Sequence, residues 1–260
     1  MIDVSIIIVN YNTCRMTQEC IDSIYEKTRE VEFEVILVDN ASKDGSKEHF
    51  SHDSRIHYVY SEKNGGFGYG NNRGMEVAKG KYFFLLNSDT LLKNNAVKLF
   101  FDYAESHEPR TVYGCYLEKP DGSYNGSFHF FPAFTIKQFI HRLRFGQDGT
   151  PTFRECDVEC IGGTDLFLPH FVYEECGGFD ENIFMYGEDG EWQYRMSLHG
   201  IRRMLIPMPK IVHLGGGSVG HINRKNRKMH FKSHFYILRK YMKKPTFCLA
   251  RLYYFLRTGF

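Results

Sequence analysis

Short apolar runs alternate with longer mixed segments along the first part of the chain. Residues 4–10, VSIIIVN, form a β-branched run without polar alternation, and residues 33–40, FEVILVDN, repeat the pattern. Two further strands are predicted at 55–62 and 81–87. A continuous apolar run of this length is typical of a strand that is buried on both faces of a sheet. We therefore expect a parallel sheet inside the protein.

Segments of helix length separate these runs, at about 15–28, 43–51 and 70–79. Strands that alternate with helices form parallel sheets covered by helices and joined by right-handed crossovers. The predicted class is thus α/β. In such sheets ligands bind where the carboxyl ends of the strands meet the loops.

Polar residues stand at these strand ends. They are Asn10, Tyr11 and Asn12 after the first run, Asp39 and Asn40 after the second, and Asn87, Ser88 and Asp89 after the fourth. Asn, Asp and Ser are also good helix caps, and capping accounts for Ser42 and Asn94. For Asp39 and Asp89 we favour a functional role, because one edge of one sheet collects both carboxylates together with Tyr11. Such carboxylates bind a ribose or base, or hold a hard cation.

The glycine-rich stretch NGGFGYGNNRG, residues 64–74, fits no placement of the dinucleotide fingerprint G-x-G-x-x-G. The first strand, where that fingerprint belongs, is followed by NYNTC without a glycine. A nicotinamide-dependent dehydrogenase is therefore disfavoured. We expect these glycines to let the backbone pass close to a bound ligand before a helix starts near Gly70. A flexible loop is the alternative.

Composition bounds the protein class. With 260 residues, 42% of them hydrophobic, the chain supports one main domain with an appendage. The seven cysteines are odd in number and form no C-x-x-C pair, which favours free thiols in a reducing cytoplasm. The segment MIDVSIIIVNYN has an acid, Asp3, where a signal peptide has a positive charge, and its apolar run is too short for a signal peptide. Since no run approaches about 18 apolar residues, we expect a protein that is soluble or lies on a membrane without crossing it.

The net charge of +2 conceals a division along the chain. Glu191 is the last acidic residue, and residues 192–260 carry 15 Lys and Arg. The preceding part has 18 basic against 31 acidic residues, a charge of about −13. This asymmetry indicates an anionic partner for the tail, whether a membrane, a nucleic acid or a phosphorylated substrate. The alternative is a basic surface folded against an acidic body.

The tail has an amphipathic pattern. Between 226 and 243 its apolar positions recur at helical spacing beside a cationic face, and after Pro245 an apolar, aromatic stretch is interrupted by Arg251 and Arg257. A basic, aromatic amphipathic helix suits an anionic membrane surface. Packing onto the rest of the protein is the alternative.

Five motifs in order resemble a known family: VSIIIVNYN, VILVDNASKDGS, NGGFGYGNNRG, AKGKYFFLLNSDT and GGFDENIFMYGEDGEWQYR. Together they are similar to the inverting family 2 glycosyltransferases with the GT-A fold, especially the bacterial polysaccharide branch that contains rhamnosyltransferases. The resemblance covers roughly residues 3–218. It implies an α/β, GT-A-type, mixed and mostly parallel sheet flanked by helices, with a basic helical C-terminal appendage. The implied domains are a catalytic domain at 1–218, with a donor half at about 1–110 and an acceptor half at about 111–218, and a tail at 219–260.

The resemblance also implies roles for individual residues. Donor-binding residues would be Tyr11, Asn12, Asp39, Asn64, Asn72, Asn87 and Ser88. Asp89 takes the last position of the family's Asp-x-Asp motif, whose first Asp is Asn87 here, and would bind Mn²⁺ or Mg²⁺ together with His213. Without the family context, His213 reads as an ordinary structural histidine. The acceptor side would be formed by Gly163, Thr164, Asp165, Trp192 and Arg195, although Trp192 and Arg195 could equally be core and surface residues.

An inverting transfer requires one general base and no covalent nucleophile. YGEDGEWQYR supplies adjacent acids at a helix start, where they also favour the helix dipole. The resemblance favours Asp189 as the base, with Glu188 as its helper or rival. A helix places residues 188 and 191 on one side and Asp189 elsewhere.

We therefore expect an inverting, metal-dependent glycosyltransferase. It would move a sugar from a nucleotide-diphosphate sugar, for which dTDP-rhamnose is a candidate, to a saccharide acceptor, lipid-linked at the cytoplasmic face of a membrane, in bacterial surface polysaccharide synthesis. We expect peripheral membrane contact through the tail and no nucleic-acid partner, and the sequence is compatible with an oligomer. The alternatives are a sugar nucleotidyltransferase, which would release pyrophosphate, and a non-enzymatic α/β module that binds nucleic acid or membrane.

Overall fold

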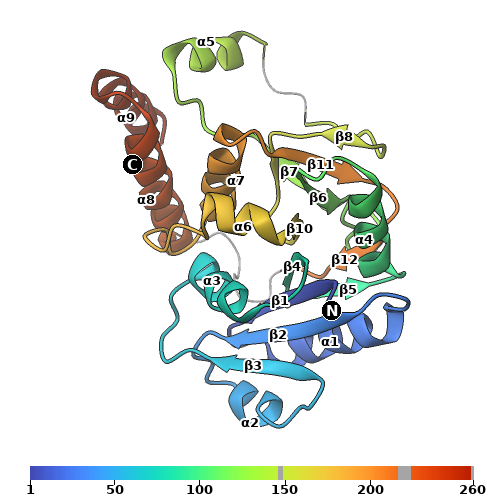
Figure 1. Ribbon diagram of the computed structural model, residues 1–260. Helices are drawn as coiled ribbons and strands as arrows, with labels where there is room; N and C mark the ends of the chain where they lie inside the picture. Colours follow the sequence, from blue (N-terminus) through green and yellow to red (C-terminus); the bar gives the residue numbers. More distant parts are fainter. Residues whose placement is uncertain (146–148, 216–223, 259–260) are drawn as a thin grey trace.

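The computed structural model describes residues 1–145, 149–215 and 224–258. Its centre is an eight-stranded sheet with the strand order β3-β2-β1-β4-β10-β6-β11-β8 (Figure 1). Neighbouring strands are parallel from β3 to β4, whereas β10 runs antiparallel between β4 and β6. The sheet is therefore mixed and mostly parallel, as expected. Its strands are β1 (Val4–Asn10), β2 (Phe33–Asp39), β3 (Ile56–Tyr60), β4 (Tyr82–Asn87), β6 (Thr111–Cys115), β8 (Cys156–Asp157), β10 (Asp165–Pro169) and β11 (Arg202–Ile206).

Two short antiparallel pairs lie outside this sheet. β5 (Thr90–Leu92) pairs with β12 (Ile211–His213), and β7 (Phe128–His129) pairs with β9 (Cys160–Ile161). Both pairs join segments that are far apart in sequence, and each contains or borders residues of the candidate site.

Helices cover both faces of the sheet (Figure 1). They are α1 (Cys14–Lys27), α2 (Ser46–Phe50), α3 (Phe67–Val77), α4 (Ala96–Ser106), α5 (Ile136–Phe145), α6 (His170–Cys176), α7 (Glu188–Leu198), α8 (Arg224–Tyr241) and α9 (Lys244–Thr258). On β1, Ile6 and Ile8 belong to the apolar cluster formed with α1 and α4, while Ile7 belongs to the one formed with α3, α6 and α7. All three isoleucines are fully buried. The unbroken apolar run in the sequence thus reflects a strand with a helix layer on each side.

The predicted strands at 4–10, 33–40, 55–62 and 81–87 correspond to β1, β2, β3 and β4. The helix expected near Gly70 begins three residues earlier, at Phe67. Gly70 and Gly74 lie inside this helix and let it pack closely on the sheet. A Cβ atom at Gly70 would lie 2.6 Å from Val9, and one at Gly74 would lie 2.3 Å from Ile7. At these two glycines the backbone approaches β1 closely.

The C-terminal helices α8 and α9 stand beside the body (Figure 1). α8 packs on the body: Ile237 and Leu238 are buried in a third apolar cluster, and Ser233 Oγ donates a hydrogen bond to the Met185 carbonyl at 2.7 Å. α9 instead leaves large apolar side chains exposed. The expected boundary at residue 218 lies outside the described residues, as does the start of the tail up to 223. In the parts of the chain that the structure describes, no helix has the length and apolarity needed to cross a membrane.

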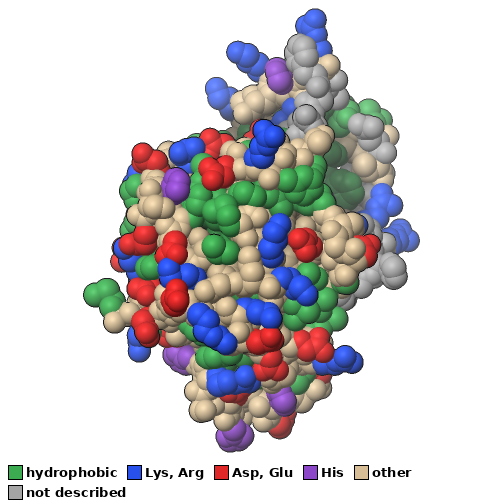
Figure 2. All heavy atoms as spheres, turned by 90° about the vertical axis from the view of Figure 1, so that its right-hand side faces the viewer, with side chains coloured by type: hydrophobic (Ala, Val, Ile, Leu, Met, Phe, Trp, Pro, Cys, Tyr) green, Lys and Arg blue, Asp and Glu red, His purple; other side chains and the backbone are tan. Residues whose placement is uncertain are grey.

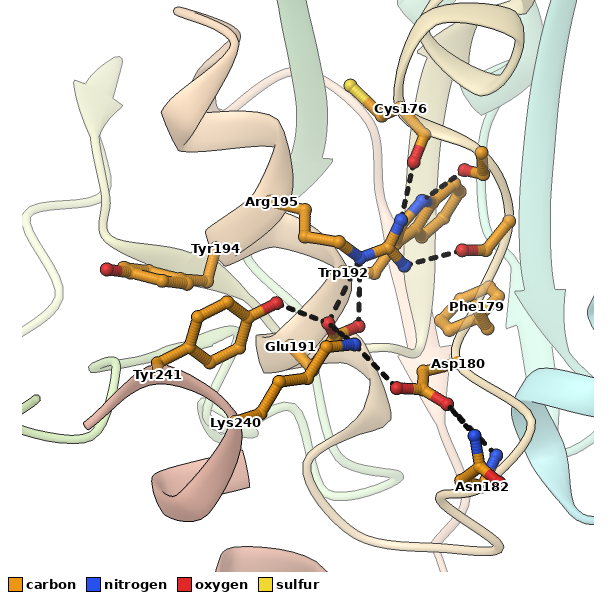
Figure 3. Close-up of polar contacts among 12 residues, drawn as sticks. Cys176, Phe179, Asp180, Asn182, Glu191, Trp192, Tyr194, Arg195, Lys240 and Tyr241 are labelled. Atoms are coloured by element: carbon orange, nitrogen blue, oxygen red, sulfur yellow. Dashed lines mark hydrogen bonds and ion pairs between the residues drawn. The ribbon is translucent and has the colours of Figure 1, made fainter. Parts of the chain in front are cut away.

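A buried ion network joins α8 to α7 (Figure 3). The Glu191 carboxylate is fully buried and lies 3.0 Å from Arg195 Nε and 2.8 Å from Lys240 Nζ, and it accepts a 2.5 Å hydrogen bond from the Tyr241 hydroxyl. Lys240 also pairs with Asp180 at 2.6 Å. Burial alone would raise the pKa of Asp180, but hydrogen bonds, foremost that from Lys240, lower it to about 2. The tail is therefore held by charge pairing as well as by apolar packing.

We predict that Glu191→Gln lowers the free energy of unfolding by about 3 to 5 kcal/mol, because it leaves Arg195 and Lys240 without their shared buried counter-charge. Denaturant unfolding at equilibrium measures this loss. The matched control is Asp157→Asn, which breaks an exposed ion pair with Arg202 and should cost less than about 1 kcal/mol. Equal losses in the two variants would contradict the prediction.

Candidate active site

A cleft of about 1060 Å³ opens beside the carboxyl end of β4. One wall comes from the sheet edge and the start of α7, and the opposite wall comes from α5, α8 and α9. Its lining includes Asn87, Gly163 and Thr164 near the sheet, Glu188 and Asp189 on α7, and His230, His234 and Tyr254 on the tail. A cleft of this size accommodates a ligand larger than a single sugar ring.

Asp89 and His213 lie side by side at this edge of the sheet. The pairing of β5 with β12 sets Thr90 opposite His213 and brings His213 Nε2 to 3.2 Å from Asp89 Oδ1. Both side chains are mostly buried, with 11% of Asp89 and 21% of His213 exposed. Two ligands at right angles about an octahedral ion with bonds of about 2.1 Å are roughly 3 Å apart. The pair therefore fits a single divalent cation, and a carboxylate with an imidazole suits Mn²⁺.

A second group also offers ligand atoms. His129, Cys160 and Asp189 place an imidazole nitrogen, a sulfur and a carboxylate oxygen within 4.8 Å of one another. Burial raises the pKa of the Cys160 thiol well above its usual range, so the thiolate that a metal requires is disfavoured there. Asp89 with His213 is the better cation site.

The loops after β1 and β2 are bonded to each other. The Asp39 carboxylate is fully buried and accepts hydrogen bonds from the Ser42 amide at 2.9 Å and the Tyr58 hydroxyl at 2.7 Å. Ser42 Oγ in turn accepts from the Asn12 amide at 3.0 Å, and Asn12 Oδ1 accepts from the Lys43 amide at 2.7 Å. Asp39 is thus a buried anchor that fixes the conformation of these loops through hydrogen bonds. Tyr11, in the loop after β1, is partly exposed.

The other expected donor-side residues fall into two places. Asn64 Oδ1 accepts from Asn40 Nδ2 at 3.0 Å, so Asn64 adjoins the loop after β2, and Ser88 Oγ lies 3.1 Å from Thr13 Oγ1 beneath the loop after β1. Asn72 points elsewhere: its amide group donates to the Phe179 carbonyl at 3.0 Å and accepts from the Phe179 amide at 2.8 Å. The structure therefore uses the Asn72 side chain to hold the segment after α6.

Asp189 sits in the first turn of α7, facing the cleft. Gly187, at φ 91°, precedes the helix and turns the chain into it. Asp189 Oδ2 accepts a hydrogen bond from the Gly163 amide at 3.0 Å and lies 3.8 Å from His129 Nε2. This carboxylate is thus held between a backbone amide and an imidazole at the cleft wall.

Glu188 is adjacent but differs in environment. Its side chain is 6% exposed, and within the described ranges Oε2 has no hydrogen-bond partner. Burial, and after it the neighbouring Asp189 charge, raises the pKa of Glu188 to about 8. Two adjacent carboxyl groups therefore differ in their surroundings, and Glu188 is predominantly protonated at neutral pH.

The residues expected on the acceptor side separate in the structure. Gly163 and Thr164 line the cleft. Trp192 is fully buried against Phe179, and its Nε1 donates to the Gly177 carbonyl at 2.7 Å, so it is a core residue and not a platform for a sugar. Arg195 is occupied by Glu191 and by the carbonyls of Cys176 and Gly178.

Asp165 also lies in the interior. It is fully buried on β10, where it accepts from the Cys115 amide at 2.7 Å, and burial raises its pKa to about 7. Asp165 therefore lies below the surface and does not line the cleft, whereas Thr164 does.

Several residues of the cleft belong to no motif in the sequence. His129 and the aromatic segment after it lie outside the strands and helices predicted from the sequence, because β7 is only two residues long and its partner β9 is remote. Tyr186, which lines the cleft, adopts φ 73°, a conformation that is rare for a bulky residue. Such strain persists where the surroundings fix it, commonly at functional sites.

The sequence pattern of "Glycosyl transferase family 2" matches residues 5–162 of the chain. The chain therefore belongs to glycosyl transferase family 2, and the expected family is confirmed. Among its relatives, glycosyltransferase GlyG of Streptococcus pneumoniae is 30% identical over 49% of this chain and 43% of its own length. The dTDP-rhamnosyl transferase RfbF of Shigella flexneri is 22% identical over 94% of this chain and 79% of its own length.

The fold matches solved structures of glycosyltransferases. The crystal structure of GalNAc-T7 with UDP, GalNAc and Mn²⁺ superimposes with a TM-score of 0.71 at 15% identity, covering 92% of this chain and 48% of that one. The GT-A-type fold class is confirmed. The chain spans less than half the length of GlyG and of GalNAc-T7.

We predict that the stability gained by Glu188→Gln increases with pH. Between about pH 4.5 and 8 the unfolded chain has released the Glu188 proton while the folded chain retains it, so the stability of the wild type falls as pH rises in this window. In thermal unfolding, the Tm of the variant minus that of the wild type should be larger at pH 8 than at pH 6. Glu175→Gln is the control, since Arg110 lowers the pKa of exposed Glu175 and that group is ionised at both pH values. A constant difference between Glu188→Gln and wild type would refute the assignment.

Proposed function

We propose that the protein is an inverting, metal-dependent glycosyltransferase that uses a nucleotide-diphosphate sugar. The observation that carries the proposal is a single cleft that has the proposed cation site near one wall and a carboxylate on another. Asn87 lines the cleft at the sheet edge, two residues before Asp89, which pairs with His213. Asp189 lines the cleft on α7. A leaving diphosphate and an acceptor hydroxyl require different groups, and family membership supplies the reaction class.

The donor is proposed to lie across the carboxyl ends of β1, β2 and β4. Tyr11 and Asn12 would contact the nucleoside, and Asn64 and Asn87 would flank the sugar diphosphate. Asp39 and Ser88 act there by holding the loops in place, since both side chains are buried against them. Asn72 contributes through the segment after α6. The dTDP-rhamnose donor is supported by similarity to RfbF over 94% of this chain.

Asp89 and His213 would hold the divalent cation. Bound there, Mn²⁺ or Mg²⁺ supplies Lewis-acid stabilisation of the diphosphate leaving group. Asn87 in place of a second carboxylate leaves the pair with a single negative charge. This ligand set is supported by the 3.2 Å contact between the two side chains and by their burial.

Asp189 is proposed to take the proton of the acceptor hydroxyl. Inversion follows when the deprotonated oxygen attacks the anomeric carbon opposite the departing diphosphate, without a covalent enzyme intermediate. Glu188 stays protonated at neutral pH, because a negative charge on it would be buried and would repel the charge of Asp189. A neutral Glu188 thus leaves Asp189 as the one ionised carboxylate of the two. The Gly163 amide and His129 orient the base.

The acceptor is proposed to be a saccharide linked to a lipid at the cytoplasmic face of a membrane, in surface polysaccharide synthesis. The tail carries cations without any acid, and the cleft is bounded on one side by tail helices. All seven cysteines are free, which agrees with a reducing compartment. Release of nucleoside diphosphate and not pyrophosphate would separate this function from a nucleotidyltransferase, and a non-enzymatic binder would release neither.

We predict that Asp89→Ala abolishes metal-dependent donor binding and lowers transfer at least about a hundredfold, because the cation loses its carboxylate ligand. Calorimetric titration of dTDP-rhamnose with and without Mn²⁺ measures binding. Asp102→Ala on α4, an exposed carboxylate paired with Lys98, is the control and should bind as the wild type does. Wild-type affinity that is the same with and without metal would exclude the proposed cation site.

We predict that Asp189→Asn leaves donor affinity nearly unchanged and lowers turnover by a factor of about 10² to 10⁴, as loss of a general base does. Single-turnover kinetics with saturating donor measures the step. Glu188→Gln keeps a neutral group where the wild type has one at neutral pH, so its effect should be much smaller. Full activity in Asp189→Asn combined with loss in Glu188→Gln would move the base by one residue.

A further inference from the structure

α5, α8 and α9 enclose an apolar cavity of about 280 Å³. Its lining is aliphatic and aromatic apart from two threonines and the hydroxyls of Tyr253 and Tyr254. A dry cavity of about 150 Å³ is enough to bind benzene, so this one admits a longer stretch of hydrocarbon. Ring contacts hold the three helices around it: Phe139 on α5 meets Tyr253 on α9 at 4.9 Å between ring centroids, and Tyr254 meets His234 on α8 at 4.8 Å.

The cavity adjoins the catalytic cleft. Ala133, Phe139, Tyr253 and Tyr254 line both spaces, so the cavity and the cleft share a boundary. Arg142, also on α5, lines the cleft on this side. A chain seated in the cavity with its polar end at this boundary would place that end near the cleft that contains Asp189.

α5 and α9 expose apolar side chains beside the cavity, which we call the apolar rim and define as Ile136, Ile140, Leu249, Leu252, Phe255 and Leu256. These side chains are 48 to 75% exposed, and they make up half of the large hydrophobic side chains that the described residues expose. Ile136, Ile140 and Leu249 line the cavity as well. A concentration of exposed apolar side chains of this kind marks an interaction surface.

The charges around the rim are of one sign. Lys137 and Arg144 on α5, and Lys244 and Arg251 on α9, are exposed, and neither helix contains Asp or Glu. The face of the body seen in Figure 2 carries both signs interspersed, whereas the segment projecting at its top, which is α5, shows Lys and Arg. An apolar surface framed by cations is complementary to an anionic lipid. A second copy of the chain would bring like charges together.

We propose that the cavity between α5, α8 and α9 binds the hydrocarbon chain of an anionic lipid, the acceptor, while the apolar rim rests on the membrane, so that the lipid's polar end enters the cleft. This inference rests on the proposed function, because it names the acceptor's lipid portion. The occupant is a prenyl or acyl chain that ends in a phosphate. The cavity supplies chain recognition and the rim supplies membrane contact.

Binding of isopentenyl, geranyl and farnesyl phosphate to the full chain tests the cavity. Affinity, measured by calorimetry, should rise by about tenfold or more from the shortest to the longest chain, because each added isoprene unit buries further apolar surface. Ala250→Phe, which fills the cavity, should remove this dependence on chain length. The paired variant Leu252→Ser, on the rim but outside the cavity lining, should retain it. Equal affinities for the three ligands in the wild type, which no folding defect can explain, would overturn the cavity assignment.

Sedimentation with phosphatidylcholine vesicles, with and without phosphatidylglycerol, tests the rim. We expect recovery with the anionic vesicles to be several times higher, and Leu252→Ser combined with Leu256→Ser to lower it to the neutral level. Leu198→Ser, which removes an apolar side chain exposed at the end of α7, is the matched control and should sediment as the wild type does. Equal recovery with both vesicle types, or a dimer in light scattering that the rim variants disrupt, would overturn the membrane assignment.

Metal-dependent release of nucleoside diphosphate, measured on the same samples, separates the two proposals. Release without chain-dependent binding of prenyl phosphates would remove the lipid site and leave the glycosyltransferase proposal standing. Chain-dependent binding without release would keep the lipid site and remove the proposed transfer.

Discussion

The carboxylate of Glu191 is the charge on which the arrangement of the cleft depends. It lies at zero exposure, and an ionised carboxylate in such a place is tolerable only with its counter-charges and hydrogen bonds in position. Arg195 comes from the same helix, whereas Lys240 and Tyr241 come from the tail (Figure 3). Because Asp189 stands two residues before Glu191 on α7, the charge pairing that docks the tail also fixes the helix that carries the proposed base.

Much of the sheet was predictable because its central strands are buried on both faces. β1, β2 and β4 have continuous apolar runs, and their polar ends mark the edge where the cleft opens. The start of α3 was predicted three residues too late because residues 67–69 stand in a glycine-rich stretch, which is typical of a loop. Gly70 and Gly74, inside the helix, serve close packing on Val9 and Ile7. β7 and β9 escaped notice because strands of two residues owe their existence to pairing between distant segments.

The candidate site was predictable where the resemblance supplied long-range information. Nothing local in the sequence places His213 next to Asp89, and the 3.2 Å contact arises from the pairing of β12 with β5. Trp192 and Arg195 show the opposite limit. In the sequence, the spacing of an arginine one helical turn after an acid is the same whether that face of the helix is exposed to solvent or buried. In the structure, Glu191 and Arg195 pair inside the protein. His129 reaches Asp189 only through the short β7–β9 pair.

The ion pairs and the hydrogen bond between the tail and the body limit how the sequence of such a protein can change during evolution. Lys240 binds two acids of the body, Asp180 and Glu191, and Tyr241 binds one of them, so exchange of this tail for that of another family member would strand buried charges on both sides. The tail and these acids must therefore change together. The tail helix that borders the cleft is thus tied to α7, the helix with the proposed base, and is not a module that can be recombined alone.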